Sequence, residues 1–180
     1  FSDALCEKAV SLVFRFLPLA FQDGTNLLAR EKMHNASCMA GLAFNSAGLG
    51  LNHGMAHAIG AKLHIAHGRI NAMLLPHIIE FNSDINKHSK SQAKYLPAVE
   101  RYKTVARILG LSSYNTIMTV RNLVNWVQFM LKEMDIPLSV SQMGKISKEE
   151  YFAEIERMAE AALADGCTAT NPRVPSKADV

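Results

Sequence analysis

Apolar residues recur at helical spacing along most of the chain. The clearest case is the segment 114–134, whose apolar stripe consists of Val120, Leu123, Val124, Val127, Met130, Leu131 and Met134. Because side chains three or four positions apart lie on one face of an α-helix, this pattern predicts an amphipathic helix. No alternation of apolar and polar residues persists for more than a few positions, so no β-strand is expected.

The same pattern predicts further helices separated by turn residues. Ser2 is a candidate N-cap for the first helix, and the Asp23-Gly24 turn precedes the second, which Thr25 or Asn26 can cap. The expected helices are 1–17, 26–47, a short one carrying His53 and His57, 69–81, 96–109, 114–134 and 147–165. The fold class is therefore predicted to be all-α, with about seven helices in a single helical domain over residues 1–180.

Several details of these helices can be tested. The second helix has a face of small residues, which suits either close approach of another backbone or plain core. Pro76 should kink or break the fourth helix, and Ser147 with Glu150 forms a capping box for the last. The expected buried stripes are Ile70, Met73, Leu74, His77, Ile78 and Phe81 in the fourth helix, and Phe152, Ile155, Met158, Ala159 and Leu163 in the last. The polar, lysine-rich stretch 82–94 is predicted to be a solvated linker.

Four histidines lie in the stretch 48–76, which overlaps the longest uncharged run of the chain, 33–61. The polar residues of that run predict a buried segment with a polar function. His53 and His57 are four residues apart, so a helix would place both rings on one face. His67 follows, just before Gly68, on the turn where that helix should have ended. His64 belongs to a different face.

This spacing allows a metal site but does not require one. Imidazole suits iron, zinc, copper or nickel. The zincin motif is excluded because Gly54, and not Glu, follows His53, and a zinc finger is excluded because no Cys pair lies nearby. No Asp or Glu lies between Lys32 and Glu80, so any further ligand must come from elsewhere. The alternative is that these histidines are satisfied core or surface residues.

Composition narrows the class of protein. Apolar residues make up 49% of the chain and charged residues 19%, enough for a sizeable core. The net charge of +3 comes from interspersed acids and bases, and without a basic stripe no nucleic-acid partner is expected. No signal peptide or bilayer-spanning apolar run is found, so no membrane partner is expected. The scattered Cys6, Cys38 and Cys167 indicate reduced thiols and a cytoplasmic location.

Both ends of the sequence predict a piece of a longer protein. A helical pattern begins at Phe1 without an initiator Met, and the S-x-x-D capping box at Ser176–Asp179 should open a further helix. A small protein trimmed in maturation is the alternative. No GGGS or GxGxxG loop occurs in the 180 residues, so no dinucleotide-binding motif is expected within them.

The run GLAFNSAGLGLNHGMAHAIGAKLHIAHGRINAMLLPHIIEFN resembles the second half of the iron-containing (group III) alcohol dehydrogenases, and most of all the propanol dehydrogenase branch. DGCTATNPRVPS near the end resembles the family's C-terminal NPR-P element. The family motif is HxxxH followed by HG, which His53, His57 and His67 fit. Many members have Pro before the final HG where this chain has Ala66, which relaxes the turn.

The resemblance implies a role for each histidine. In the family the first and third bind the metal, which implies His53 and His67 as ligands. The middle one lies near nicotinamide and substrate and relays a proton, which implies His57 as catalytic and cofactor-binding. The family's other two ligands, an Asp and a His, lie upstream, as does its α/β dinucleotide-binding domain, and neither is expected in this chain.

The expected function follows from the resemblance. It is interconversion of small primary alcohols and aldehydes, with Fe²⁺ (zinc being the alternative) and NAD(H) or NADP(H) bound mainly by the upstream domain; the isolated chain is expected to be inactive. A homo-oligomer and association with a bacterial microcompartment are compatible with it. The competing hypothesis is a non-catalytic helical interaction module whose histidines are structural.

Overall fold

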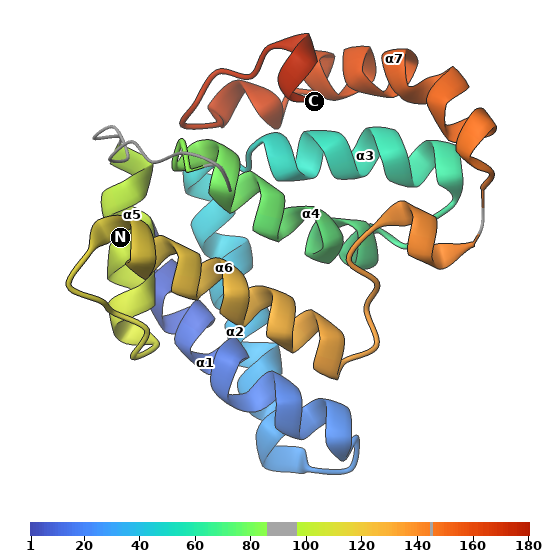
Figure 1. The fold of residues 1–180 in the computed structure, drawn as a ribbon. Helices are drawn as coiled ribbons and strands as arrows, with labels where there is room; N and C mark the ends of the chain where they lie inside the picture. The colour runs from blue at the N-terminus through green and yellow to red at the C-terminus, as the bar shows by residue number, and fades with distance from the viewer. Residues whose placement is uncertain (86–96, 145) are drawn as a thin grey trace.

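The structure is a computed structural model that describes residues 1–85, 97–144 and 146–180. Within these ranges all regular secondary structure is helical, which confirms the predicted all-α class (Figure 1). The long helices are α1 (Ser2–Gln22), α2 (Leu27–Ala47), α3 (Leu51–Leu63), α4 (His67–Asn82), α5 (Pro97–Ile108), α6 (Thr116–Glu133) and α7 (Lys148–Ala164). The short ones are η1 (Val140–Met143), η2 (Thr168–Thr170) and η3 (Lys177–Asp179). Most of the predicted linker, and the expected start of α5 at residue 96, lie outside the described residues.

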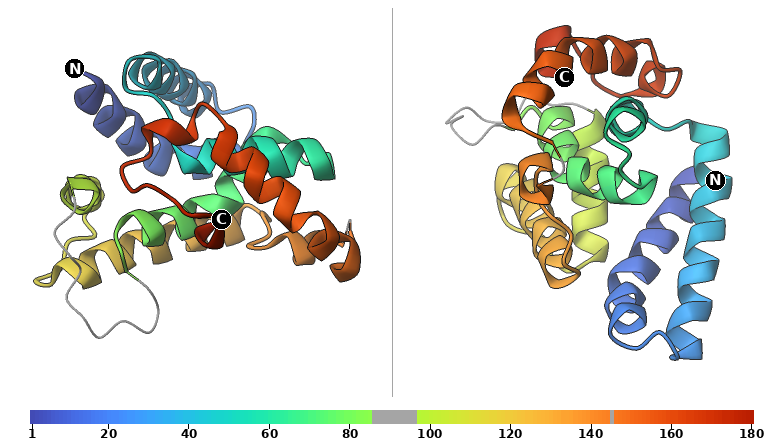
Figure 2. Two further views of the ribbon diagram at one scale, coloured as in Figure 1. Left: turned by 90° about the horizontal axis from the view of Figure 1, so that it is seen from above. Right: turned by 90° about the vertical axis from the view of Figure 1, so that its right-hand side faces the viewer.

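Helices α1 and α2 form a pair at one edge of the molecule (Figures 1 and 2). The predicted turn between them is confirmed, and the Asn26 side chain caps α2 by accepting from the Ala29 N–H at 3.0 Å. The prediction for the end of α1 was wrong, because the helix continues through Pro18 to Gln22. Pro18 removes one internal hydrogen bond, yet the helix continues past it to the C-cap residue Asp23, five residues further on. Phe1, and not Ser2, is the N-cap residue.

The small face of α2 is only partly a packing face. Ala36 and Ala43 are fully buried, whereas Ala47 is exposed. Leu42 and Phe44 are about half exposed, so the prediction that the whole uncharged run is buried was wrong for α2. Since this helix contacts mainly α1, its other faces meet solvent.

The core consists of two apolar clusters, and α4 contributes to both. One joins α4, α5 and α6 through Ile79, Ile85, Val99, Val120, Val124, Val127 and Leu131. The other joins α3, α4 and α7 through Ala56, Ile59, Ile65, Ile70, Met73 and Met158. The predicted stripe of α6 is buried throughout. In α4 the prediction was wrong for His77, which is exposed, and it missed Ile79, because a helix between two clusters buries more than one stripe.

Helix α7 lies against α3, and its capping box is confirmed: Ser147 Oγ accepts from the Glu150 N–H, and Glu150 accepts from the Ser147 N–H. Phe152 is 58% exposed, so its assignment to the buried stripe was wrong; Ala162 is buried on that side instead. Pro76 does not break α4, which runs without interruption to Asn82. In the described part of the chain no helix is long and apolar enough to cross a membrane.

The segment after α7 folds back over the start of α3. Asn171 accepts from the Leu51 N–H at 3.1 Å and donates to Asn82 Oδ1 at 2.7 Å. Arg173 donates to the Phe81 carbonyl at 2.7 Å and lies over the Phe81 ring. We call this segment, residues 165–173, the C-terminal strap. The predicted second capping box forms at Ser176, but it opens only the short helix η3.

Candidate active site

The three motif histidines come together where α3 meets α4. His53 and His57 lie one turn apart on α3, and their ring centroids are 6.1 Å apart. The ring of His67 lies 5.3 Å from that of His53 and 5.2 Å from that of His57, on which it stacks. The predicted ligands His53 and His67 are thus on the same side of the domain, as sharing one ion requires. Their role as ligands stays a prediction.

The turn between the helices differs from the expectation. Helix α3 ends at His64, which adopts a left-handed conformation with φ 51° and so reverses the chain. His67 was predicted to lie on a turn before a helix from residue 69; instead it is the first residue of α4. The Ala66 carbonyl accepts from Arg69 and Ile70, so Gly68 lies within the first helical turn. Gly68 therefore does not end a helix, although its place in the sequence suggested that it would.

A carboxylate that the sequence did not indicate completes the cluster. Asp165, the residue that ends α7, accepts from His57 Nδ1 through Oδ2 at 2.9 Å. Its other oxygen, Oδ1, accepts from the Cys167 N–H at 2.8 Å. The hydrogen bond from His57, and then that from Cys167, hold the pKa of the Asp165 carboxyl below its usual value. In the sequence Asp165 was visible only as part of an Asp-Gly helix end.

A chain of amides supports His67 from the other side. The Asn71 Nδ2 group donates to the His67 carbonyl at 3.0 Å and lies 3.1 Å from His67 Nε2. Asn52 Nδ2 in turn donates to Asn71 Oδ1 at 2.8 Å. These contacts fix the orientation of the Asn71 amide, which in turn helps to hold the His67 ring in place. The four-residue spacing of His67 and Asn71 was the available sequence signal for this contact.

The electrostatics favour the uncharged form of His53. Burial lowers the pKa of His53, and repulsion by His67 and His57 lowers it further. Neutral imidazole is the form that binds a metal ion, and it suits iron or zinc. The donor types of His53 and His67 thus fit the implied metal.

A second grouping of donor atoms overlaps this one. His57, Asp165 and Cys167 have ligand atoms within 4.8 Å of one another. Partial burial and the Asp165 carboxylate raise the pKa of the Cys167 thiol, which opposes the thiolate form that metals bind. We therefore favour His53 and His67 as the metal-binding pair.

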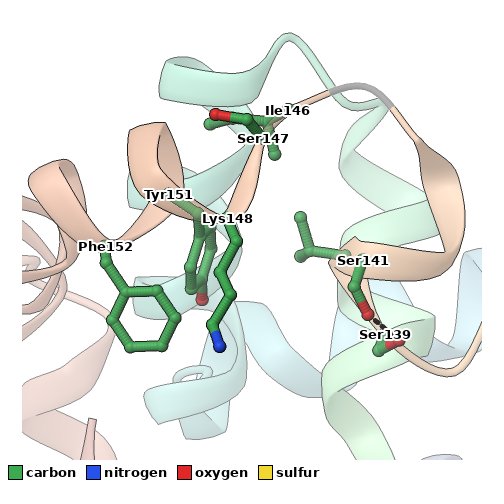
Figure 3. A pocket seen from close by; sticks show the side chains of 8 residues that line it. Ser139, Ser141, Ile146, Ser147, Lys148, Tyr151 and Phe152 are labelled. Carbon is green, nitrogen blue, oxygen red and sulfur yellow. Dashed lines mark hydrogen bonds between the residues drawn. The ribbon is translucent and has the colours of Figure 1, made fainter.

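A hollow of about 610 Å³ lies elsewhere, between η1 and the start of α7 (Figure 3). Lys148, Tyr151 and Phe152 border one side, and Ser139 and Ser141, which hydrogen-bond each other, border another. No histidine or carboxylate is among its described lining residues, so it lacks an acid–base pair. The histidine cluster is the better candidate for chemistry.

The sequence profile described as "Fe-containing alcohol dehydrogenase family, C-terminal" matches residues 1–180. The chain belongs to this family. It is 39% identical over 174 residues to a 1-propanol dehydrogenase of Citrobacter freundii, a match that covers 97% of this chain and 45% of the relative. It is 35% identical over 181 residues to a bifunctional aldehyde-alcohol dehydrogenase of Escherichia coli, covering 97% of this chain and 20% of the relative.

Among solved structures, a 1,3-propanediol oxidoreductase aligns with a TM-score of 0.84 and 32% identity. That alignment covers 99% of this chain and 43% of the other. The chain thus spans less than half the length of the relatives that it matches. This agrees with the prediction of a C-terminal, helical part of the dehydrogenase fold.

Proposed function

We propose that this chain forms the metal-binding part of an NAD(P)-linked alcohol dehydrogenase that interconverts small primary alcohols, such as 1-propanol or ethanol, and their aldehydes. The observation that carries the proposal is the clustering of the three family-motif histidines, with no ring centroid more than 6.1 Å from another. The names of the relatives, which include 1-propanol dehydrogenase, support the substrate class. Their names do not decide between NAD(H) and NADP(H).

Each histidine has a distinct role in the proposal. His53 and His67 would hold Fe²⁺, and a bound ion of this kind polarises a carbonyl or alkoxide oxygen as a Lewis acid. Hydride transfer is the chemistry of the nicotinamide cofactor. His57 would accept the alcohol proton during oxidation and return it during reduction, as a general base and then a general acid. A homo-oligomer and microcompartment association belong to the proposal through family resemblance alone, whereas the proposed cytoplasmic location rests on the scattered cysteines.

Metal content and rate, measured together on protein from the complete reading frame that encodes this chain, test these roles. His53→Ala and His67→Ala should lose iron and activity together, because Fe²⁺ ranks low in the affinity order and needs its full ligand set. His57→Ala should keep iron and lose about 10²–10⁴-fold in kcat. His77→Ala is the matched control, since His77 is exposed on the same helix as His67.

Two results would count against the proposal. If His57→Ala loses iron as completely as the other two, His57 is a ligand and the proton relay fails. If none of the three substitutions changes iron content or rate, the histidines are structural, and this result would support the hypothesis of a non-catalytic interaction module. The 180 residues purified alone should not reduce propanal, because the resemblance places the cofactor domain and two metal ligands outside them.

A further inference from the structure

The Asp165 carboxylate is held in place independently of His57. Its Oδ1 atom accepts from the backbone N–H of Cys167, and its backbone carbonyl accepts from the Thr168 N–H at 3.0 Å. These local bonds close the corner where α7 passes into η2. The other oxygen, Oδ2, faces α3 and meets His57 Nδ1 at 2.9 Å.

Close packing fixes the distance between this corner and α3. A Cβ atom on Gly54 would lie 2.0 Å from Thr168 Oγ1 and 3.0 Å from the Ala162 carbonyl. Thr168 Oγ1 donates to that same carbonyl at 2.6 Å, and Thr168 is buried. Gly54 lies one turn before His57 on α3, so the helix and the corner approach closely beside the histidine. The fold therefore holds both members of the pair, Asp165 and His57, in position.

A carboxylate can only accept a hydrogen bond at neutral pH, so the nitrogen that faces it must carry the proton. In neutral His57 this places the proton on Nδ1 and leaves Nε2 with a free lone pair. We propose that Asp165 is the positioning residue that fixes this tautomer and so prepares His57 Nε2 to accept the alcohol proton. The catalytic part of this inference rests on the proposed function; the tautomer does not.

The substitution Asp165→Asn tests the inference without dismantling the corner. The amide oxygen of the new Asn can still accept from the Cys167 N–H. The flipped amide is disfavoured, because it would place the amide NH₂ group against the Cys167 N–H, and both are donors. The amide nitrogen must then face His57 Nδ1, and it can only donate. The variant should therefore keep the fold but move the proton of neutral His57 to Nε2.

Nitrogen-15 NMR of the histidine-labelled chain, at a pH above the titration of its histidines, measures the tautomer directly. We expect the Nδ1–H form of His57 in the native chain and the Nε2–H form in Asp165→Asn. Asp3→Asn, which removes an exposed carboxylate paired with Arg101, should leave His57 unchanged. An Nε2–H form in the native chain, or no change in Asp165→Asn, would overturn the inference.

Kinetics of the complete enzyme supply the second readout. Asp165→Asn should keep iron content and KM while kcat falls on the order of 10²-fold, because a general base in the wrong tautomer cannot take the proton. A normal kcat in Asp165→Asn together with a slow His57→Ala enzyme would sink this inference alone. A normal kcat in His57→Ala would instead sink the proposed relay, and the NMR result would still decide whether Asp165 fixes the tautomer.

Discussion

At the scale of single residues, the cluster is notable for how its histidines are supported. Two of the three make a side-chain contact: His57 with Asp165, and His67 with Asn71. His53 is the histidine whose pKa falls, mainly through burial. The three rings are therefore supported in different ways, although they lie in one cluster.

The amide chain behind His67 leads to a prediction about stability. Asn71→Ala should cost about 1–2 kcal/mol in the free energy of unfolding, because the half-buried Asn52 amide loses its side-chain acceptor. Asn52 Oδ1 is already buried without a partner among the described atoms. Removing both amides should therefore cost less than the sum of the single changes. Urea unfolding of the two single variants and the double variant measures this coupling, and strict additivity would contradict it.

At the scale of helices, the contact of α3 with the C-terminal strap allows a matched pair of substitutions. Gly54→Ala should destabilise the protein by roughly 1–3 kcal/mol, because the new methyl group would overlap Thr168 in a packed corner. Gly41→Ala, in α2, should instead stabilise by roughly 0.5–1 kcal/mol, since a Cβ there meets open space and alanine favours helix. In thermal unfolding, Gly54→Ala should lower the melting temperature and Gly41→Ala should raise it. Equal shifts of the melting temperature in the two variants would contradict the packing argument.

The capping box of α7 gives a pH prediction. Hydrogen bonds from the Ser147 N–H and hydroxyl groups hold the pKa of Glu150 below its usual value. A lowered folded-state pKa means that the stabilising bond is fully present above the unfolded-state pKa, 4.5 for this group, and is lost as pH falls through the folded-state value. The stability difference between the native chain and Glu150→Gln should therefore shrink below about pH 4.5.

Urea unfolding of both proteins at several pH values checks this window. Ser147→Ala should cost about 1 kcal/mol at neutral pH by removing the other half of the box. A difference between native chain and Glu150→Gln that stays constant down to pH 3 would show that the carboxylate does not contribute through its charge.

At the scale of the whole molecule, the strap ties distant parts together through Asn171. Its side chain contacts the start of α3, the end of α4 and the carbonyl of Arg173. Asn171→Ala should cost about 1–3 kcal/mol, because Asn82, which is buried, loses a partner. Lys177→Ala, which removes exposed ion pairs near the end of the chain, is the control and should change stability by less than about 1 kcal/mol. Equal losses would contradict the role of Asn171.

Sequence patterns predicted what depends on neighbours along the chain. The stripe of α6, the turn at Asp23 and the capping box of α7 were all confirmed, because each is decided within a few residues. The HxxxH motif followed by HG identified the three histidines for the same reason. His77 and Phe152 were misplaced because helical spacing defines a face but not which neighbour covers it.

Asp165 could not be found in this way. It is separated from His57 by 108 positions, and its own surroundings in the sequence are those of an ordinary helix end. Only the packing of α7 on α3, through Gly54 and Thr168, brings the two together. The partner of His57 is thus a property of the tertiary fold, even though His57 itself belongs to a local motif.

The same separation has a consequence for protein synthesis. A chain leaving the ribosome presents His53, His57 and His67 long before Asp165 and Asn171 have been made. During that interval α3 lacks both the residue that caps its first N–H and the carboxylate beside His57. A nascent chain stalled before residue 165 should therefore lack both of these contacts to α3. The order of translation thus delays assembly of the site until nearly all 180 residues are available to it.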